Sequence, residues 1–202
     1  MKTRMTRLLS LLTALALAPA AMASPGASVP ASGRLAFDVI RKDRDIGDYV
    51  VTFRGSGDDL TVDIATDVHV RVPVIGVAAY RFSQTSTETW RGGQLAGLAS
   101  RTDDNGTPHD IRVGATSLIP ASLWNADMVR SSAVLNTIDG STDPISVSNL
   151  GTENVATGSG TVAATHYALR GGLNRDLWYA GATLVHVRFA AEDGSQVDYV
   201  LR

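Results

Sequence analysis

The sequence has 202 residues, with 18 basic and 20 acidic side chains, a net charge of −2 at pH 7 and no cysteine. Nucleic-acid surfaces and polybasic membrane patches need clustered positive charge, which this composition does not provide. The lack of cysteine excludes disulfide bonds, thiolate metal ligands, a cysteine nucleophile and a lipid-modified cysteine.

The first 23 residues predict a cleavable signal peptide. Three basic residues lie within the first seven, an apolar run follows over residues 8–17, and Pro19 precedes the small residues Ala21 and Ala23. The alternative is a membrane anchor, but the apolar run is short for spanning a bilayer. We therefore expect cleavage near Ala23, a mature chain without a transmembrane segment, and a periplasmic or secreted location.

The rest of the chain predicts a short leader and one β domain. Residues 24–32 are small and contain proline, so we expect them to be disordered. From residue 33 to residue 202, apolar and polar side chains alternate with period two between turn signals. The predicted strands lie around residues 35–41, 48–54, 60–65, 68–72, 77–90, 94–101, 109–114, 133–138, 145–147, 162–170, 177–179, 183–190 and 196–201.

This pattern predicts an all-β fold, an antiparallel meander curled into a barrel, roll or clam-like sheet, with little helix after the signal peptide. The best short helix candidate covers residues 121–125, after Pro120. Residues 141–160, rich in Ser, Thr, Gly and Asn, are expected to form a mobile loop or an irregular edge. Asn105-Gly106 predicts a hairpin turn and not a calcium loop, because arginines occupy two of the ligand positions.

Glu88 is the strongest candidate for chemistry. In a continuous strand it shares one face with Tyr80, Phe82 and Trp90. A carboxyl on an aromatic face has a raised pKa or a cationic partner, so Glu88 could be an acid, a base or a ligand anchor. We favour the structural alternatives, an ion pair with Arg101 or a strand whose inward register ends before Glu88.

Other catalytic and metal-binding signals are absent from the sequence. His69, His109, His166 and His186 lack the spacing that brings two imidazoles to one metal, so we predict no metal and no cofactor. Recognisable serine-nucleophile, zinc-protease and phosphate-loop motifs are also missing. A triad assembled by the tertiary structure stays possible, because triads are defined by geometry.

The aromatic side chains indicate a ligand site or a capped core. Trp90, Trp124 and Trp178-Tyr179 each lie near a turn, where aromatic residues can line the mouth of a cavity. Capping of the core is the alternative that we favour for the tryptophans. If a ligand site exists, its predicted residues are Tyr80, Phe82, Glu88, Trp90, Trp124, Trp178 and Tyr179.

Five motifs in this order resemble an exported bacterial family known as domain of unknown function 6134. They are ETWRGGQL at 88–95, TDDNG at 102–106, PASLWN at 120–125, LWY at 177–179 and DGSQVDYVL at 193–201. The family has no established activity, so the resemblance implies no functional residue. Ala180 stands where an acidic or amide residue would be expected, which argues against a catalytic role there. A distant similarity to lipoprotein-carrier-like clams implies a curved sheet open on one side.

We therefore expect a module that binds or carries an apolar or amphipathic small molecule, and we favour a non-enzymatic role. An envelope hydrolase using Glu88 as acid or base is one alternative. A structural or assembly partner that presents an exposed strand edge is another. The sequence does not determine the oligomeric state.

Overall fold

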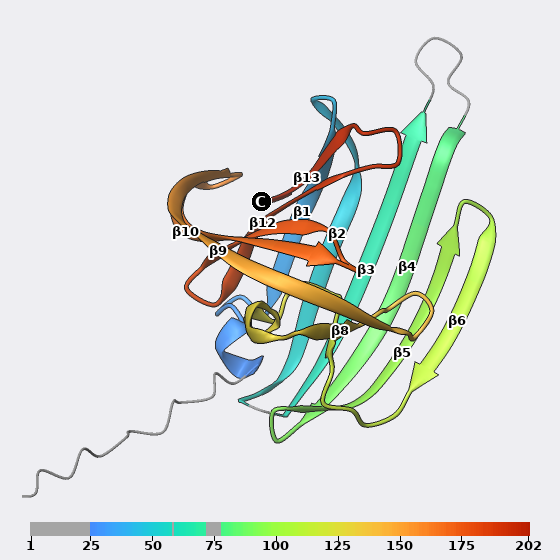
Figure 1. Cartoon of the computed structure of the whole chain (residues 1–202), viewed down its shortest axis with the longest axis vertical. Coiled ribbons are helices and arrows are strands. Elements are labelled where there is room, and N and C mark those ends of the chain that lie inside the picture. The colour runs from blue at the N-terminus through green and yellow to red at the C-terminus, as the bar shows by residue number, and fades with distance from the viewer. Residues whose placement is uncertain (1–24, 58, 72–77) are drawn as a thin grey trace, which may run out of the picture.

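A computed structural model describes residues 25–57, 59–71 and 78–202 of the chain (Figure 1). The predicted signal peptide and Ser24 lie outside these residues. The strands are β1 Arg34–Arg41, β2 Arg44–Ser56, β3 Asp59–Arg71, β4 Ala78–Arg91, β5 Gln94–Asp104, β6 Thr107–Val113, β7 Ile119–Pro120, β8 Ala133–Leu135, β9 Thr142–Thr157, β10 Gly160–Gly171, β11 Arg175–Ala180, β12 Thr183–Ala190 and β13 Gln196–Leu201. Two short 3₁₀ helices complete the fold, η1 Pro25–Ser28 and η2 Ala126–Arg130.

The strands form one curled sheet in the order β6-β5-β4-β3-β2-β1-β13-β12-β11-β10-β9-β8-β7. Neighbouring strands are antiparallel, and the short β7–β8 pair is parallel. The sheet does not close, because β6 and β7 stand at its two ends. Figure 1 shows the β4–β6 strands on one side of the curl and β9–β10 on the other. The predicted all-β, curled antiparallel fold is confirmed.

Period-two alternation explains which side chains fill the interior. On β3, Leu60, Val62, Ile64, Thr66 and Val68 are buried, and the residues that alternate with them are more exposed. The same alternation on the other long strands gives one continuous apolar cluster that includes residues of β1, β5 and β11–β13. The curl thus encloses its own core.

A β-bulge between Val39 and Ile40 adds curvature where β1 meets β2. Gly47, opposite the bulge, has a φ of 155°. A Cβ atom there would lie 1.9 Å from the carbonyl oxygen of Asp67 on β3. Glycine is therefore required for the close approach of β2 and β3 at this corner.

Residues 25–32 are ordered, so the expectation of a disordered leader is wrong for this part of the chain. Ser28 is buried, and its hydroxyl accepts a hydrogen bond from the Ala126 amide at 3.1 Å, at the start of η2. Val29 packs against the core. A segment with few apolar residues is held here by the buried residues Pro25 and Ser28, by the packing of Val29 and by a hydrogen bond to the start of η2.

Of the two alternatives for residues 141–160, the mobile loop is wrong and the irregular edge describes the structure, because β8 pairs with β9 only over residues 142–144 and the β9–β10 register shifts near its middle. Residues 142–157 form β9, which pairs with β10 from Thr157 to Ile145. Much of β9 is exposed, and Leu150 projects into solvent. Backbone hydrogen bonds to β10 hold this strand, and they do not require apolar side chains.

The helix expected at residues 121–125 does not form. Leu123 has a φ of 68°, which an α-helix does not accommodate, and the helical turn begins only at Ala126. The predicted Asn105-Gly106 hairpin turn does join β5 to β6, with positive φ at both residues.

Candidate functional site

Glu88 lies in the core of the curled sheet, with none of its surface exposed. Its Oε2 accepts hydrogen bonds from the indole Nε1 of Trp90 at 2.9 Å and of Trp124 at 3.0 Å. Burial raises the pKa of Glu88, and hydrogen bonds from the side chains of Ser122, Trp90 and Trp124 oppose this rise.

The ion pair expected between Glu88 and Arg101 is wrong. Arg101 is opposite Thr85 in the β4–β5 register, so the two side chains lie on the outer face of the sheet. The Arg101 side chain is 73% exposed and pairs with Asp110 at 3.0 Å. Two neutral indole donors therefore hold the Glu88 carboxyl in place of a cation, and its inward register does reach position 88.

Residues 120–125, which we call the plug segment, enter the interior above Glu88. The Tyr49 hydroxyl donates to the carbonyl oxygen of Ser122, and the Tyr179 hydroxyl donates to that of Leu123 at 2.5 Å. The Ala121 amide donates to the Leu135 carbonyl at 2.9 Å. Hydroxyl groups from opposite parts of the sheet thus satisfy the backbone of a buried, non-helical segment.

Edge-to-face aromatic contacts complete this end of the interior. The Trp124 ring lies 5.2 Å from that of Phe53 and 5.7 Å from that of Trp90, at interplanar angles of 78° and 81°. Trp124 and Glu88 are fully buried. We call this region the filled end, because its side chains leave no route for a substrate to reach the carboxyl.

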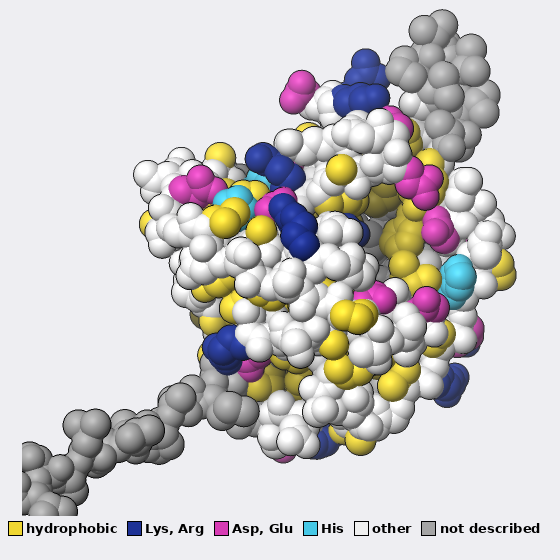
Figure 2. Space-filling view, in the orientation of Figure 1, with side chains coloured by type: hydrophobic (Ala, Val, Ile, Leu, Met, Phe, Trp, Pro, Cys, Tyr) yellow, Lys and Arg dark blue, Asp and Glu magenta, His cyan; other side chains and the backbone are white. Residues whose placement is uncertain are grey.

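The opposite end of the same face is open. Along the inward row of β4, Trp90 is 2% exposed, Gln84 and Phe82 are half-buried, and Tyr80 is 38% exposed. On β3, Val70 is half-buried, whereas Leu60 at the other end is buried. Figure 2 shows a hollow on this face of the molecule, with hydrophobic side chains inside and acidic side chains at its rim.

Three residues from the second half of the sheet belong to this open end. Tyr199 on β13 lies opposite Val39 on β1 and Val187 on β12, in the row that continues through β2 and β3 to Phe82. Phe189 packs edge-to-face on Tyr199, with centroids 5.7 Å apart. Arg175 lies over the Phe189 ring, with 4.0 Å between its Cζ and the ring centroid. We define the open end by Val70, Tyr80, Phe82, Arg175, Phe189 and Tyr199.

Trp178 does not join the other tryptophans. It packs with Val155, Ala164 and Val185 in a separate cluster on the opposite face of the sheet from Leu177 and Tyr179. Its indole Nε1 donates to Glu153 at 2.5 Å. The expectation that Trp178 lines one cavity with Trp90 and Trp124 is therefore not met, because successive residues of β11 point to opposite faces.

Two histidines flank Trp178 on this outer face. The His166 ring stacks on the indole at 4.1 Å, and the His186 ring meets it edge-on at 4.9 Å. His166 contacts Asp176 and His186 contacts Asp198, at 3.1 and 2.8 Å. Burial lowers the pKa of His186, although the Asp198 carboxylate opposes this shift.

Within the described ranges, no group of three or more His, Asp or Glu side chains is placed to hold a metal ion. An open groove of about 490 Å³ lies beside β4–β6, with Arg101, Asp103, Pro108 and Asp110 among its lining residues. This groove contains none of the predicted ligand residues. Among the described residues, no helix is long and apolar enough to cross a membrane.

The structure therefore divides the predicted site into three parts. Tyr80 and Phe82 lie at the open end. Glu88, Trp90, Trp124 and Tyr179 build the filled end. Trp178 belongs to the outer face. Sequence reasoning missed Arg175, Phe189 and Tyr199, although the alternation over residues 183–190 and 196–201 could have placed Phe189 and Tyr199 on inward faces.

Comparisons with known proteins agree with this architecture. The family described as domain of unknown function DUF6134 matches residues 37–202. A comparison with curated proteins gave no match. A solved structure from Brucella abortus, titled as a beta-barrel-like protein of domain of unknown function DUF1849, is similar in fold, with a TM-score of 0.50 and 11% identity. The similarity covers 84% of this chain and 94% of the other.

Proposed function

The chain belongs to the family described as domain of unknown function DUF6134, and this membership implies no activity, so we propose its function from the geometry. The proposed function is the binding or carriage of an apolar or amphipathic ligand in the open end of the sheet. One observation carries the proposal. Along one inward face, β4 goes from fully buried side chains at Glu88 and Trp90 to exposed aromatic surface at Tyr80. Concave apolar surface beside a few polar groups is the usual form of a small-molecule site.

The division of the interior supports a specific assignment of roles. The proposed ligand contacts are Val70, Tyr80, Phe82, Phe189 and Tyr199, which lie on both walls of the open end. The filled end forms the floor of the hollow, so the hollow does not continue to the other end of the curled sheet. Of the ligand residues predicted from the sequence, this proposal retains Tyr80 and Phe82 on β4 and leaves out Glu88, the tryptophans and Tyr179.

The binding proposal predicts that the protein takes up an apolar fluorescent probe. We expect N-phenyl-1-naphthylamine to bind at one site, and dodecanol to displace it. Phe82→Asp places a charge on the half-buried inward surface and should weaken probe binding by about ten-fold or more. Val155→Ala, in the Trp178 cluster on the outer face, is the matched control and should leave the affinity unchanged.

Fluorescence titration of both variants and the wild type measures this effect, with far-UV circular dichroism as the check on folding. If the wild type does not bind the probe, or if Phe82→Asp binds it as tightly as the wild type, the open end is not a ligand site.

We also propose that the chain acts outside the cytoplasm. The proposal is supported by the basic residues, apolar run and small residues at the start of the sequence. Expression of the full chain in a bacterial host, fractionation and intact mass measurement test it. The expected product is periplasmic or secreted and lacks residues 1–23, whereas an uncleaved product in the cytoplasm would contradict it.

No specific observation favours the alternative of a hydrolase that uses Glu88. Its carboxyl is fully buried, and one oxygen already accepts two indole hydrogen bonds. A general acid or base has to come within hydrogen-bond reach of the substrate. Glu88 is better explained as part of the support for the plug segment.

A further inference from the structure

Arg175 is a cation on the inward face of the sheet. It begins β11 and shares its face with Leu177 and Tyr179, which are both buried in the core. Its guanidinium lies over the Phe189 ring and is half-buried. The charge therefore lies at the open end, against an aromatic wall.

This cation has no carboxylate partner among the described residues. The hydrogen bond that its guanidinium makes is from Nη1 to the backbone carbonyl of Asn174, at 2.8 Å. Burial lowers the pKa of Arg175, and the nearby Tyr199 phenol, with no carboxylate among the described residues, opposes this shift. A guanidinium has five N–H donors in a planar fork, so most of its donors are available to a bidentate anion.

Arg188 provides an internal comparison. Its guanidinium also lies over an aromatic ring, that of Trp178, at 5.5 Å. On this outer face, however, Arg188 pairs with Asp198 at 2.7 Å. Arg41, whose side chain is 17% exposed, likewise pairs with Asp193 at 2.6 Å. Arg41 and Arg188 therefore each have a carboxylate counter-ion, whereas Arg175 at the open end has none among the described residues.

A half-buried cation without an anion costs free energy, which a bound counter-ion recovers. We infer that the open end binds an amphipathic anion, whose carboxylate or phosphate headgroup pairs with Arg175 while its apolar chain lies along Phe82, Phe189 and Tyr199. This inference rests on the proposed ligand-binding function and adds the charge of the ligand. Tyr199 and Phe189 connect the two parts, because both contact the apolar surface beside the guanidinium.

The test compares amphiphiles that share one chain and differ in headgroup. Dodecanoate, dodecyl phosphate, dodecanol and dodecyltrimethylammonium are titrated into the full chain below their micelle concentrations, by calorimetry or probe displacement. Inorganic phosphate is titrated as well. We expect the two anionic amphiphiles to bind wild-type protein at least about ten-fold more tightly than dodecanol, because hydrogen bonds between charged groups are stronger than those to a neutral hydroxyl.

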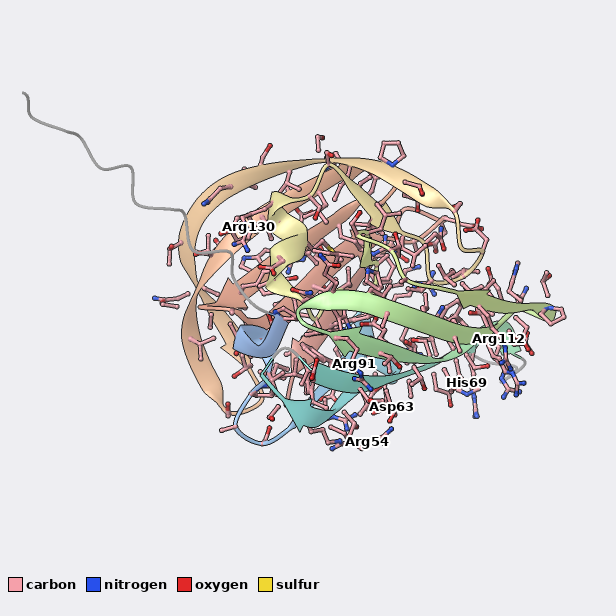
Figure 3. All side chains as sticks on the ribbon, turned by 90° about the horizontal axis from the view of Figure 1, so that it is seen from below. Arg54, Asp63, His69, Arg91, Arg112 and Arg130 are labelled. Carbon is pink, nitrogen blue, oxygen red and sulfur yellow. The ribbon has the colours of Figure 1, made fainter. Side chains whose placement is uncertain are left out.

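Arg175→Gln should remove this preference. It should weaken dodecanoate binding by at least about ten-fold and leave dodecanol binding within about two-fold of wild type. Retained dodecanol binding also shows that the variant is folded. Arg54→Gln is the matched control, because Arg54 pairs with Asp63 on the outside of the sheet, where Figure 3 shows both side chains pointing away from the interior. It should bind all ligands as the wild type does.

The outcomes separate the two proposals. If no amphiphile binds, the ligand-binding function itself fails. If dodecanol binds but wild type does not prefer the anions, or Arg175→Gln keeps that preference, the role of Arg175 is wrong and the apolar site stands. Inorganic phosphate that binds as tightly as dodecyl phosphate would also overturn the inference, because the dodecyl group would then contribute nothing to the binding affinity. Should Arg175→Gln fail to fold, Arg175→Lys decides the matter, since it keeps the charge but loses the fork and should retain only part of the preference.

Discussion

Glu88 illustrates how one buried side chain can resemble a catalytic group and serve the fold. Its carboxyl has the raised pKa that is typical of active-site acids, but burial is the cause and two indole N–H groups are its partners. Perturbed pKa values occur at structural sites as well as at functional ones, so the environment decides between them.

Replacement of Glu88 should change the pH dependence of stability. Because the pKa of Glu88 is higher in the folded state, the folded protein keeps a proton that the unfolded chain has released. The stability from this group is fully present below the ordinary pKa of 4.5 and is lost as the pH rises through the folded value. Glu88→Gln should therefore gain thermal stability relative to wild type as the pH rises from about 4 to about 8.

Thermal unfolding of both proteins across this range measures the difference in Tm. Glu192→Gln, at an exposed position beside the β12–β13 turn, should show no comparable trend. A wild-type protein that gains stability relative to Glu88→Gln with rising pH would contradict the sign. Glu88→Ala should lose about 2–4 kcal/mol at acidic pH, because it leaves two indole donors unpaired beside a cavity, and this loss should shrink as the pH rises.

The plug segment is the element that occupies the filled end. Its backbone is not helical, so its Ser122 and Leu123 carbonyls depend on hydroxyl donors from the surrounding strands. Figure 3 shows η2, which follows the plug segment, lying between the β9–β10 hairpin and the β3–β4 strands. Contacts from both sides of the sheet thus meet at this segment.

Tyr179→Phe should destabilise the protein by about 1–2 kcal/mol, since the buried Leu123 carbonyl loses its hydroxyl donor. Tyr167→Phe is the matched control. The Tyr167 ring packs on Tyr179 at 6.3 Å, and none of the described residues accepts a hydrogen bond from its hydroxyl. Urea denaturation should show a change below about 0.5 kcal/mol for Tyr167→Phe. Equal losses in the two variants would mean that ring packing, and not the hydrogen bond, holds the segment.

The whole sheet should unfold as one unit. Its main apolar cluster runs from β1 through β5 and back to β13, so neither half buries its inner face alone. We expect one transition, with coincident midpoints by far-UV circular dichroism and tryptophan fluorescence. Trp178→Phe restricts the fluorescence signal to Trp90 and Trp124 inside the curl, and the midpoints measured by fluorescence and by circular dichroism should again coincide. Separate midpoints would show that the filled end unfolds independently of the rest of the sheet.

Refolding should be slow for a protein of this size. The pairing of β1 with β13 joins residues more than 150 positions apart, for example Phe37 with Leu201. Contacts of high sequence separation are formed late, because loop closure costs conformational entropy before they contribute stability. This architecture therefore implies refolding in milliseconds to seconds or slower.

Sequence by itself determined the fold class and the inward faces of the regular strands. The alternation over Leu60–Val68 and over Phe82–Trp90 is enough, since strand side chains point to opposite faces in turn. The same rule put Glu88 beside Trp90 on an inward face. The order of five motifs indicated the family that the comparison confirms.

Only the tertiary structure decided what each inward face meets. Alternation does not reveal that the plug segment covers Glu88, that β9 forms although most of its side chains are exposed, or that Trp178 faces away from Trp124. It also does not show that Arg175, on β11, lies on the same inward side of the curl as Phe82, on β4. The physical reason is that periodicity reports the local direction of a side chain, whereas burial, pairing and charge compensation depend on strands brought together by the curl of the sheet.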